Sequence, residues 1–499
     1  MGAATGTKAI DGGFSERLSA LDQMFLLSEQ HNTHMHVAVT AILDAGPLRN
    51  PAGGIDIDRI RAHIGARLRW IPRYRQKLSR SPLGSPIWVD DDRFNLAYHV
   101  RHTSLPRPGD ERALQALAGR IKSQQLDREK PLWEMWIVEG MADGRVALVT
   151  KAHHCMIDGI SGADLLAVLL SPESSVAAEA QSPFTPRPHP GAAALIAHEL
   201  GHRIAGTFEA GRWAISEPRA AARALGERAS ALANMLPAAF WRAADTPFNR
   251  PIGPHRRFDW LPMDLAEVKA VKHALGGTVN DVVLAVVSGA LRRFLVRRRV
   301  NVDGLELRAM VPVSVRAEHE RGGLGNRVAG WLTPLPVGEG DARRRLACVR
   351  EQTKHLKDSK QAMATETLTG VTDWTSSTVL SVAIQLALRV RPFNLVVTNV
   401  PGPQVPLYLL GARMQEVYPQ VPLFTNQGLG IALFSYDGTL FWGFNADWDL
   451  VPDLAELVDD VRASFAELHR ASRLPRPRRQ PIARPSSGGH KSNRASIRK

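Results

Sequence analysis

Residues 151–162 have the sequence KAHHCMIDGISG, and this stretch is the most informative part of the chain. The apolar alternation of RVALVTKAHH predicts a strand that ends at two adjacent histidines. Asp158 and Gly159 then indicate a turn, and SGADLLAVLL has the apolar spacing of a helix. Because adjacent strand residues point to opposite faces, we expect His153 and His154 to differ in role, one facing a cleft and the other the interior.

Several chemical roles are compatible with this stretch. Imidazole titrates near neutral pH, so one histidine could take a proton from a hydroxyl group, while Asp158 fixes the backbone through an ion pair. The same residues could instead be satisfied polar groups at a strand end, or metal ligands. Zinc is the poorer alternative, because neighbours that point apart cannot bind one ion and the sequence has no HExxH or paired CxxC motif. Cys155 could be a nucleophile beside His154, although burial is the more common fate of such a thiol.

The rest of the chain predicts helices that alternate with strands, which indicates α/β layers in both halves. Before the histidines we expect helices over 14–30, 55–70 and 111–126, and strands that begin near residues 35 and 131. After them, the expected helices are TVNDVVLAVVSGALRRFL and GDARRRLACVREQTKHLK, and the expected strands are LRAMVPVSV, NLVVTNVPGP, GLGIALFSYDG and TLFWGFNAD.

Length and composition favour two globular domains. The chain has 499 residues, of which 44% are hydrophobic, and only two cysteines, which is too few for a secreted disulfide framework. No apolar run approaches the roughly 20 residues that span a bilayer. We expect a disordered N-terminus (1–13), a first domain with the histidines (14–170), a Pro/Ser/Ala-rich linker and helical segment (171–248), a second domain (249–470) and a basic disordered tail (471–499).

The net charge of +14 is concentrated at the C-terminus. Residues 473–499 contain nine Lys or Arg and no Asp or Glu, with almost no apolar residues to form a core. Such a tail could contact anionic lipid headgroups, each basic residue contributing about 1 kcal/mol near the surface. We do not expect nucleic acid as a partner, because no aromatic residues interleave with these charges.

Beyond these patterns, HHCMIDG resembles the HHxxxDG signature of the CoA-dependent acyltransferase superfamily. Other segments, in order from about residue 14 to 470, resemble one branch of it, the bacterial wax ester synthase/diacylglycerol acyltransferase family. They are LSALDQMFLLSEQ with MHV near the start, PLWEMWIVEG, TVNDVVLAVVSGALR, MVPVSVR, GNRV, NLVVTNVPGP and YLLGARMQEVYP. The Ala/Arg-rich segment before residue 244 and the tail match nothing in this pattern.

This resemblance implies a fold and a site. The fold would be two similar chloramphenicol-acetyltransferase-like α/β domains with a substrate channel between them and HHxxxDG at its middle. His154 would be the general base, His153 would support the geometry of the site, and Asp158, followed by Gly159, would be structural.

Further motif residues follow from the same resemblance. Pro131, Leu132 and Trp133 match the family's Pro-Leu-Trp motif, and Asn280 and Asp281 match its Asn-Asp motif. We interpret both motifs as holding helix and strand in place rather than touching substrate. Asn399 would shape the channel wall, and Thr398, Asn399 or a backbone amide could stabilise the oxyanion.

An ion pair between Asp158 and Arg316, at the end of MVPVSVR, is a hypothesis from the sequence. If the two residues pair, Asp158→Asn and Arg316→Ala are expected to be non-additive in a double-mutant cycle of activity. Fully independent effects of the two substitutions would exclude the pairing.

The implied reaction transfers an acyl group from acyl-CoA to diacylglycerol, or to a long-chain alcohol, with no cofactor and no metal. We expect a cytoplasmic protein that associates peripherally with the inner membrane face or with lipid droplets. One alternative is acyl transfer to a polyketide, peptide or other lipid hydroxyl. Another is a non-catalytic lipid-surface protein, for which a damaged HHxxxDG would be expected, whereas the signature here is intact.

Overall fold

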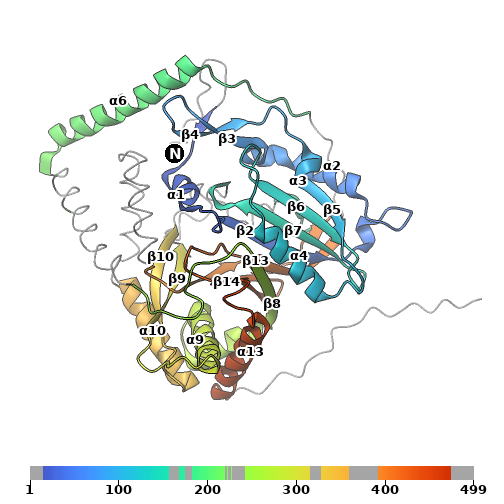
Figure 1. Cartoon of the computed structure of the whole chain (residues 1–499), viewed down its shortest axis with the longest axis vertical. Coiled ribbons are helices and arrows are strands. Elements are labelled where there is room, and N and C mark those ends of the chain that lie inside the picture. The colour runs from blue at the N-terminus through green and yellow to red at the C-terminus, as the bar shows by residue number, and fades with distance from the viewer. Residues whose placement is uncertain are drawn as a thin grey trace, which may run out of the picture.

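Two six-stranded sheets with flanking helices organise the computed structural model of the chain (Figure 1). The structure describes residues 15–156, 168–174, 183–219, 222, 226, 242–314, 328–358 and 391–473. Each sheet mixes parallel and antiparallel neighbours. The predicted two-domain α/β fold is therefore confirmed, while the channel between the domains stays a prediction.

The first sheet has the strand order β12-β13-β2-β7-β6-β5. Only β5 and β6 are parallel, and the other neighbours are antiparallel. In the order of the sheet, its strands are β12 (Tyr408–Leu409), β13 (Ala412–Gln420), β2 (His36–Leu43), β7 (Val146–His153), β6 (Trp133–Glu139) and β5 (Val100–Ser104).

The second sheet has the order β10-β9-β11-β14-β15-β8, with parallel pairing of β11 to both β9 and β14. Its strands are β10 (Val328–Leu335), β9 (Leu307–Ser314), β11 (Leu395–Pro401), β14 (Leu429–Tyr436), β15 (Thr439–Asp447) and β8 (Arg256–Asp264). Helices α8 (Leu265–Leu275), α9 (Val279–Arg297), α10 (Ala342–Asp358) and α13 (Leu454–Ala471) also belong to this half.

The first half carries a small third sheet and several short helices. The small sheet has the order β1-β4-β3. The elements are β1 (Glu16–Arg17), α1 (Ala20–Ser28), α2 (Ile57–Arg67), β3 (Gln76–Arg80), β4 (Pro86–Asp90), α3 (Leu96–His99), α4 (Glu111–Ser123) and the 3₁₀ turns η1 (Gly46–Leu48), η2 (Leu68–Trp70), η3 (Pro72–Arg75) and η4 (His154–Met156).

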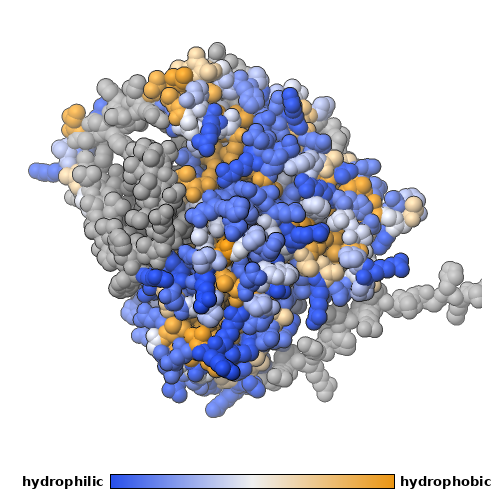
Figure 2. All heavy atoms as spheres, viewed as in Figure 1, coloured by the Kyte–Doolittle hydropathy of each residue, from blue (hydrophilic) through white to orange (hydrophobic). Residues whose placement is uncertain are grey.

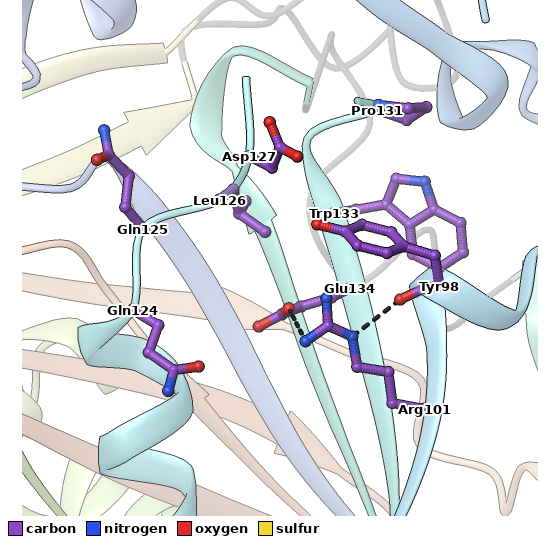
Figure 3. Close-up of a pocket in the computed structure, with 9 residues that line it drawn as sticks. All are labelled: Tyr98, Arg101, Gln124, Gln125, Leu126, Asp127, Pro131, Trp133 and Glu134. Carbon is purple, nitrogen blue, oxygen red and sulfur yellow. Dashed lines mark hydrogen bonds and ion pairs between the residues drawn. The ribbon is translucent and has the colours of Figure 1, made fainter. Parts of the chain in front are cut away.

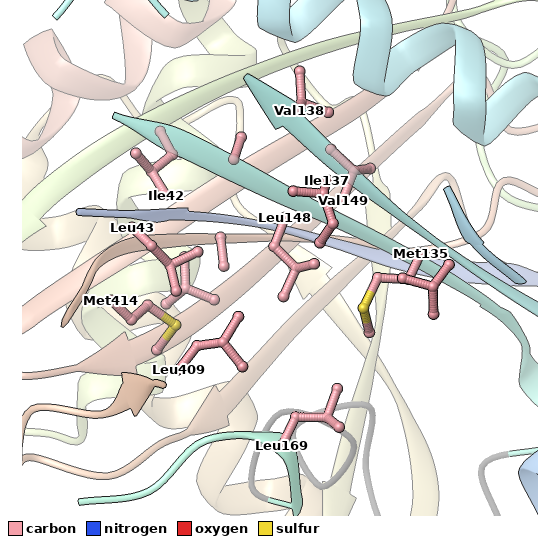
Figure 4. Packing of buried hydrophobic residues seen from close by; sticks show 14 of the residues in the cluster. Ile42, Leu43, Met135, Ile137, Val138, Leu148, Val149, Leu169, Leu409 and Met414 are labelled. Atoms are coloured by element: carbon pink, nitrogen blue, oxygen red, sulfur yellow. The ribbon is translucent and has the colours of Figure 1, made fainter. Parts of the chain in front are cut away.

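Strand β7 lies at the centre of the first sheet, and all eight of its residues are buried. Its apolar side chains pack with those of β2 and β6, as Figure 4 shows for Leu148, Val149 and Ile137. Met414, from far along the chain, joins the same cluster. The one charged residue in the strand, Lys151, is satisfied by the carbonyls of Ile121 and Gln124 at 2.7 and 2.8 Å and by the carboxylate of Glu134 at 2.7 Å. These contacts offset part of the cost of burying the charge, and burial still lowers the pKa of Lys151.

The two halves of the chain are interlocked rather than merely adjacent. Strand β13, which lies in the predicted second domain by sequence, pairs with β2 in the first sheet. Its Tyr418 ring stacks on Trp260 of β8, with ring centroids 4.7 Å apart. β13 also passes so close to β15 that a Cβ added to Gly443 would lie 1.9 Å from the carbonyl oxygen of Pro419. Only glycine fits at position 443.

Most of the predicted elements are present, with two kinds of difference. The helix predicted over 14–30 is shorter, because Ser19 caps α1 by accepting the amide of Asp22, and residues 16–17 instead pair with β4. Several elements were not predicted, among them strands β5, β8, β10 and β13 and helices α8 and α13. Pro262 lies on the edge strand β8, opposite Phe441, and Pro419 lies opposite Val39 of β2, beyond the two residues of β13 that pair with β12.

Part of the predicted linker has a defined anchor. The backbone amide and guanidinium of Arg187 donate to the carboxylate of Asp90 at 2.8–3.0 Å. Helix α6 (Ala192–Ser216) follows and lies at the edge of the molecule (Figure 1). Its Glu199 accepts hydrogen bonds from the hydroxyls of Ser81 and Ser85 at 2.6 and 2.5 Å. Helix α6 of the predicted 171–248 segment is therefore attached to the first half.

Hydrophilic residues cover most of the face shown in Figure 2, with separate hydrophobic patches between them. Within the described ranges, no single helix is long and apolar enough to cross a membrane. Only α8 and α9 meet that criterion together, as a pair bent by 96°.

Candidate acyl-transfer site

The two adjacent histidines lie where β7 ends. His153 is the last residue of the strand, and its amide donates to the carbonyl of Leu132 at 2.9 Å. His154 begins the turn η4, and its amide donates to the carbonyl of Met35 at 2.7 Å. The main chain at both histidines is thus held by the neighbouring chain segments on either side, which fixes where the two rings point.

His154 has an apolar environment and is half-buried. The ring of Phe25, from α1, stacks on its imidazole with centroids 3.7 Å apart and an angle of 19° between the planes. Burial lowers the pKa of His154 to about 4. Interaction of the ring with the backbone of the same residue acts in the opposite direction. The ring is therefore neutral at pH 7 and able to accept a proton.

His153 has a polar environment and is fully buried. Its Nδ1 accepts the backbone amide of Cys155 at 3.1 Å and lies 2.9 Å from the Cys155 sulfur. Burial raises the pKa of this thiol well above its usual value. Cys155 therefore remains a thiol at neutral pH, which argues against its use as a nucleophile.

The Pro-Leu-Trp segment supports this strand end directly. Leu132 supplies the carbonyl that His153 bonds, and the indole Nε1 of Trp133 donates to the carbonyl of Tyr74 at 2.8 Å. The imidazole of His99 stacks on Trp133 with centroids 4.7 Å apart, and its Nδ1 donates to the Trp133 carbonyl at 2.8 Å. These contacts agree with our interpretation of the motif as a positioning element.

A polar pocket of about 430 Å³ opens beside this motif (Figure 3). Arg101 crosses it, donating from Nε to the carbonyl of Tyr98 at 2.8 Å and lying 3.4 Å from the Glu134 carboxylate. The sequence did not predict this pocket. The residues that line it are Tyr98, Arg101, Gln124, Gln125, Leu126, Asp127, Pro131, Trp133 and Glu134.

The Asn-Asp motif lies at the start of α9, in the second half. Asn280 accepts a hydrogen bond at 2.7 Å from the side-chain amide of Asn399, so the structure brings these two predicted residues together. Asp281 is buried and accepts the amide of Thr278 at 2.7 Å in a capping box, and the hydroxyl of Thr353 at 2.8 Å. In the described part of the chain, no hydrogen bond or ion pair joins these residues to either histidine.

Three predicted residues, Asp158, Gly159 and Arg316, lie outside the described residues, so their pairing stays a prediction. Elsewhere, in the ranges that the structure describes, no group of three or more His, Cys, Asp or Glu side chains is arranged to hold a metal ion.

A buried polar cluster next to His153 was missed by the sequence reasoning. Its buried members are the side chains of Glu29 and His36, while His34 is partly buried and Arg128 reaches Glu29 from the exposed surface. A signal existed, since LSALDQMFLLSEQ and MHV belong to the segments that resemble the family. The pattern gave no role to these polar residues, because a carboxylate after an apolar helix usually lies in solvent.

Comparison with solved structures defines the class of the fold. A starter condensation domain of rhizomide synthetase, solved in complex with C8-CoA and Leu-SNAC, matches with a TM-score of 0.56. The match covers 92% of this chain and 95% of the other, at 14% identity. The wax ester synthase/diacylglycerol acyltransferase of Marinobacter aquaeolei VT8 matches with a TM-score of 0.65 at 27% identity, covering 92% of this chain and 100% of the other.

Family models and sequence relatives are more specific. The model described as the wax ester synthase/diacylglycerol acyltransferase catalytic domain matches residues 18–283, and the model of the C-terminal domain matches residues 324–469. A Mycobacterium tuberculosis protein that carries the name diacylglycerol O-acyltransferase is 33% identical over 469 residues, 92% of this chain and 91% of its own. A Mycobacterium bovis protein of the same name is 32% identical, over 90% of this chain and 95% of its own. The chain therefore belongs to the wax ester synthase/diacylglycerol acyltransferase family and is an acyltransferase.

The contacts of Asp281 predict an effect on stability rather than on chemistry. Asp281→Ala removes the carboxylate of the capping box and one of the two acceptors of the Thr353 hydroxyl, which keeps the carbonyl of Arg350 at 3.1 Å, so we expect the free energy of unfolding to fall by about 2 kcal/mol. The control is Asp264→Ala, which removes an exposed cap of α8 and should cost about 1 kcal/mol. For both variants, denaturant unfolding measures the loss of stability, and acyltransferase activity per folded molecule measures any effect on the chemistry. A variant with unchanged stability but lost activity would show that Asp281 acts on substrate.

Proposed function

We propose that the chain esterifies diacylglycerol with the acyl group of acyl-CoA, using His154 as general base and forming no acyl-enzyme. The observation that carries this proposal is the neutral imidazole of His154 in an intact HHxxxDG signature, stacked on Phe25 at the end of β7. Support for the substrates comes from the names of the mycobacterial and Marinobacter relatives.

The proposed reaction proceeds in one transfer. The acceptor hydroxyl gives its proton to His154 while its oxygen attacks the thioester carbonyl and forms a tetrahedral oxyanion. The oxyanion collapses, the carbon–sulfur bond breaks, and the protonated imidazole returns the proton to the CoA thiolate. Because Nδ1 of His154 is enclosed, Nε2 is the nitrogen that we assign to this proton.

Stabilisation of the oxyanion requires a hydrogen-bond donor, whose loss typically costs about 2.7–4 kcal/mol. Thr398, Asn399 and a backbone amide are our candidates from the sequence. Asn399 already donates to Asn280, which would hold its side chain in one orientation. Such pre-organisation is what an oxyanion donor needs.

A long-chain alcohol is the second candidate acceptor, and the reaction would then give a wax ester. The name of the Marinobacter relative includes wax ester synthase, which is the reason to test a long-chain alcohol as acceptor. Either acceptor is insoluble in water, so we also propose peripheral association with the inner membrane face or with lipid droplets. The basic tail is one route. If removal of residues 473–499 leaves binding to anionic vesicles unchanged, the tail has no such role.

The direct test is CoA release by the purified protein from palmitoyl-CoA, with diacylglycerol or hexadecanol as acceptor. We expect acceptor-dependent release by the wild type, and a loss of about 10²–10⁴-fold in His154→Ala because the base is gone. The control is His102→Ala. His102 is a partly exposed histidine on β5, 3.2 Å from Glu139 of β6 and distant from the histidine pair in sequence. Folded wild type that releases no CoA with either acceptor would contradict the proposal and favour other hydroxyl acceptors.

A further inference from the structure

Glu29 is a buried carboxylate surrounded by nitrogen atoms. It follows α1 as the C-cap residue, and its side chain is only 3% exposed. Its oxygens lie 3.6 Å from His34 Nδ1, 3.9 Å from His36 Nε2 and 3.6 Å from His153 Nε2, and it forms an ion pair with Arg128. A buried carboxylate is stable only when such partners replace water.

The environment keeps this carboxylate ionised. Burial by itself would raise the pKa of Glu29, but the nearby His153 and His34 and the ion pair with Arg128 outweigh that effect and hold the pKa well below its usual range. His36 is neutral, because burial and the nearby Lys151 and Lys122 lower its pKa well below the usual value. Glu29 is therefore a permanent hydrogen-bond acceptor within this cluster.

The contacts of His153 determine which of its nitrogens carries a proton. The backbone amide of Cys155 can only donate, and it points at Nδ1 of His153 from 3.1 Å. Nδ1 is therefore the acceptor, and the ring proton is on Nε2, the nitrogen that faces the Glu29 carboxylate. A carboxylate 3.6 Å from this nitrogen favours that tautomer electrostatically.

From this geometry we propose that Glu29 is a positioning residue for acyl transfer, which acts through His153 on the adjacent base. The inference rests on the proposed function of His154. The same helix supplies Phe25, which stacks on His154, so α1 and its C-cap hold both imidazole rings from one side. Glu29 does not contact the reacting atoms, and its role is to keep the end of β7 in one conformation.

Kinetics separate this role from a general effect on folding. In Glu29→Gln we expect kcat to fall by about 10–100-fold, while KM for palmitoyl-CoA changes by less than about twofold. His153→Gln should cause a similar fall, and the double variant should be little worse than either single variant, because both remove the same interaction. If the fold-reductions in kcat of the two single variants multiply in the double variant, the proposal is wrong. A Glu29→Gln variant as active as the wild type would also overturn it.

Gln30→Ala is the matched control. Gln30 is the next residue, but its exposed side chain accepts the hydroxyl of Thr425 at 3.1 Å and does not touch the cluster. We expect its kcat and KM to equal those of the wild type. A fall in kcat as large as that of Glu29→Gln would mean that the loop as a whole, and not the carboxylate, is responsible.

The tautomer can be measured without activity and without a variant of Glu29. In ¹⁵N spectra of histidine-labelled wild type, with the His153 signals assigned by their absence in His153→Gln, we expect the proton on Nε2. A proton on Nδ1 would overturn the proposal even if the enzyme is active. Conversely, an Nε2 proton in a protein that releases no CoA would leave this geometry intact and contradict only the proposed function.

Discussion

The central position of β7 between β2 and β6 is the constraint on which the site depends. Both neighbours are antiparallel to β7, and their backbone carbonyls at Met35 and Leu132 accept the amides of His154 and His153. The end of the strand is thus fixed on both sides by hydrogen bonds within a buried sheet, where an unpaired amide would be costly. This arrangement gives two adjacent imidazoles opposite environments, one stacked on Phe25 and one within a polar cluster.

The two environments suit the two histidines to different roles in an acyl-transfer site. An apolar surrounding keeps the His154 ring neutral at working pH, whereas His153 accepts the backbone amide of Cys155 and lies beside the Glu29 carboxylate. In the second half, Asn280 and Asp281 show a comparable division. Asp281 caps and ties α9, while Asn280 is bonded to Asn399 on β11. Adjacent residues of one motif therefore make different contacts, and the motif alone does not predict which contacts each residue makes.

Local patterns in the sequence predicted most of the fold and part of the site. The alternation before His153 and the capping residue Thr278 act over a few residues, so β7 and α9 were expected where the structure has them. The pairing of β13 with β2 was not, because it joins residues that lie far apart in the chain, such as Met414 and Leu43. Glu29 was missed for the same reason, since its burial arises from packing of α1 against the distant end of β7 rather than from its own neighbours.

Direct transfer to the acceptor, without an acyl-enzyme, is the central claim about the chemistry. Incubation of the wild type with palmitoyl-CoA in the absence of acceptor, followed by intact-protein mass spectrometry, tests it most directly. We predict an unmodified mass and CoA release only after diacylglycerol or hexadecanol is added, because His154 passes a proton and the buried Cys155 stays a thiol. A palmitoylated protein, with the acyl group on Cys155 and transferable to the acceptor, would contradict the claim.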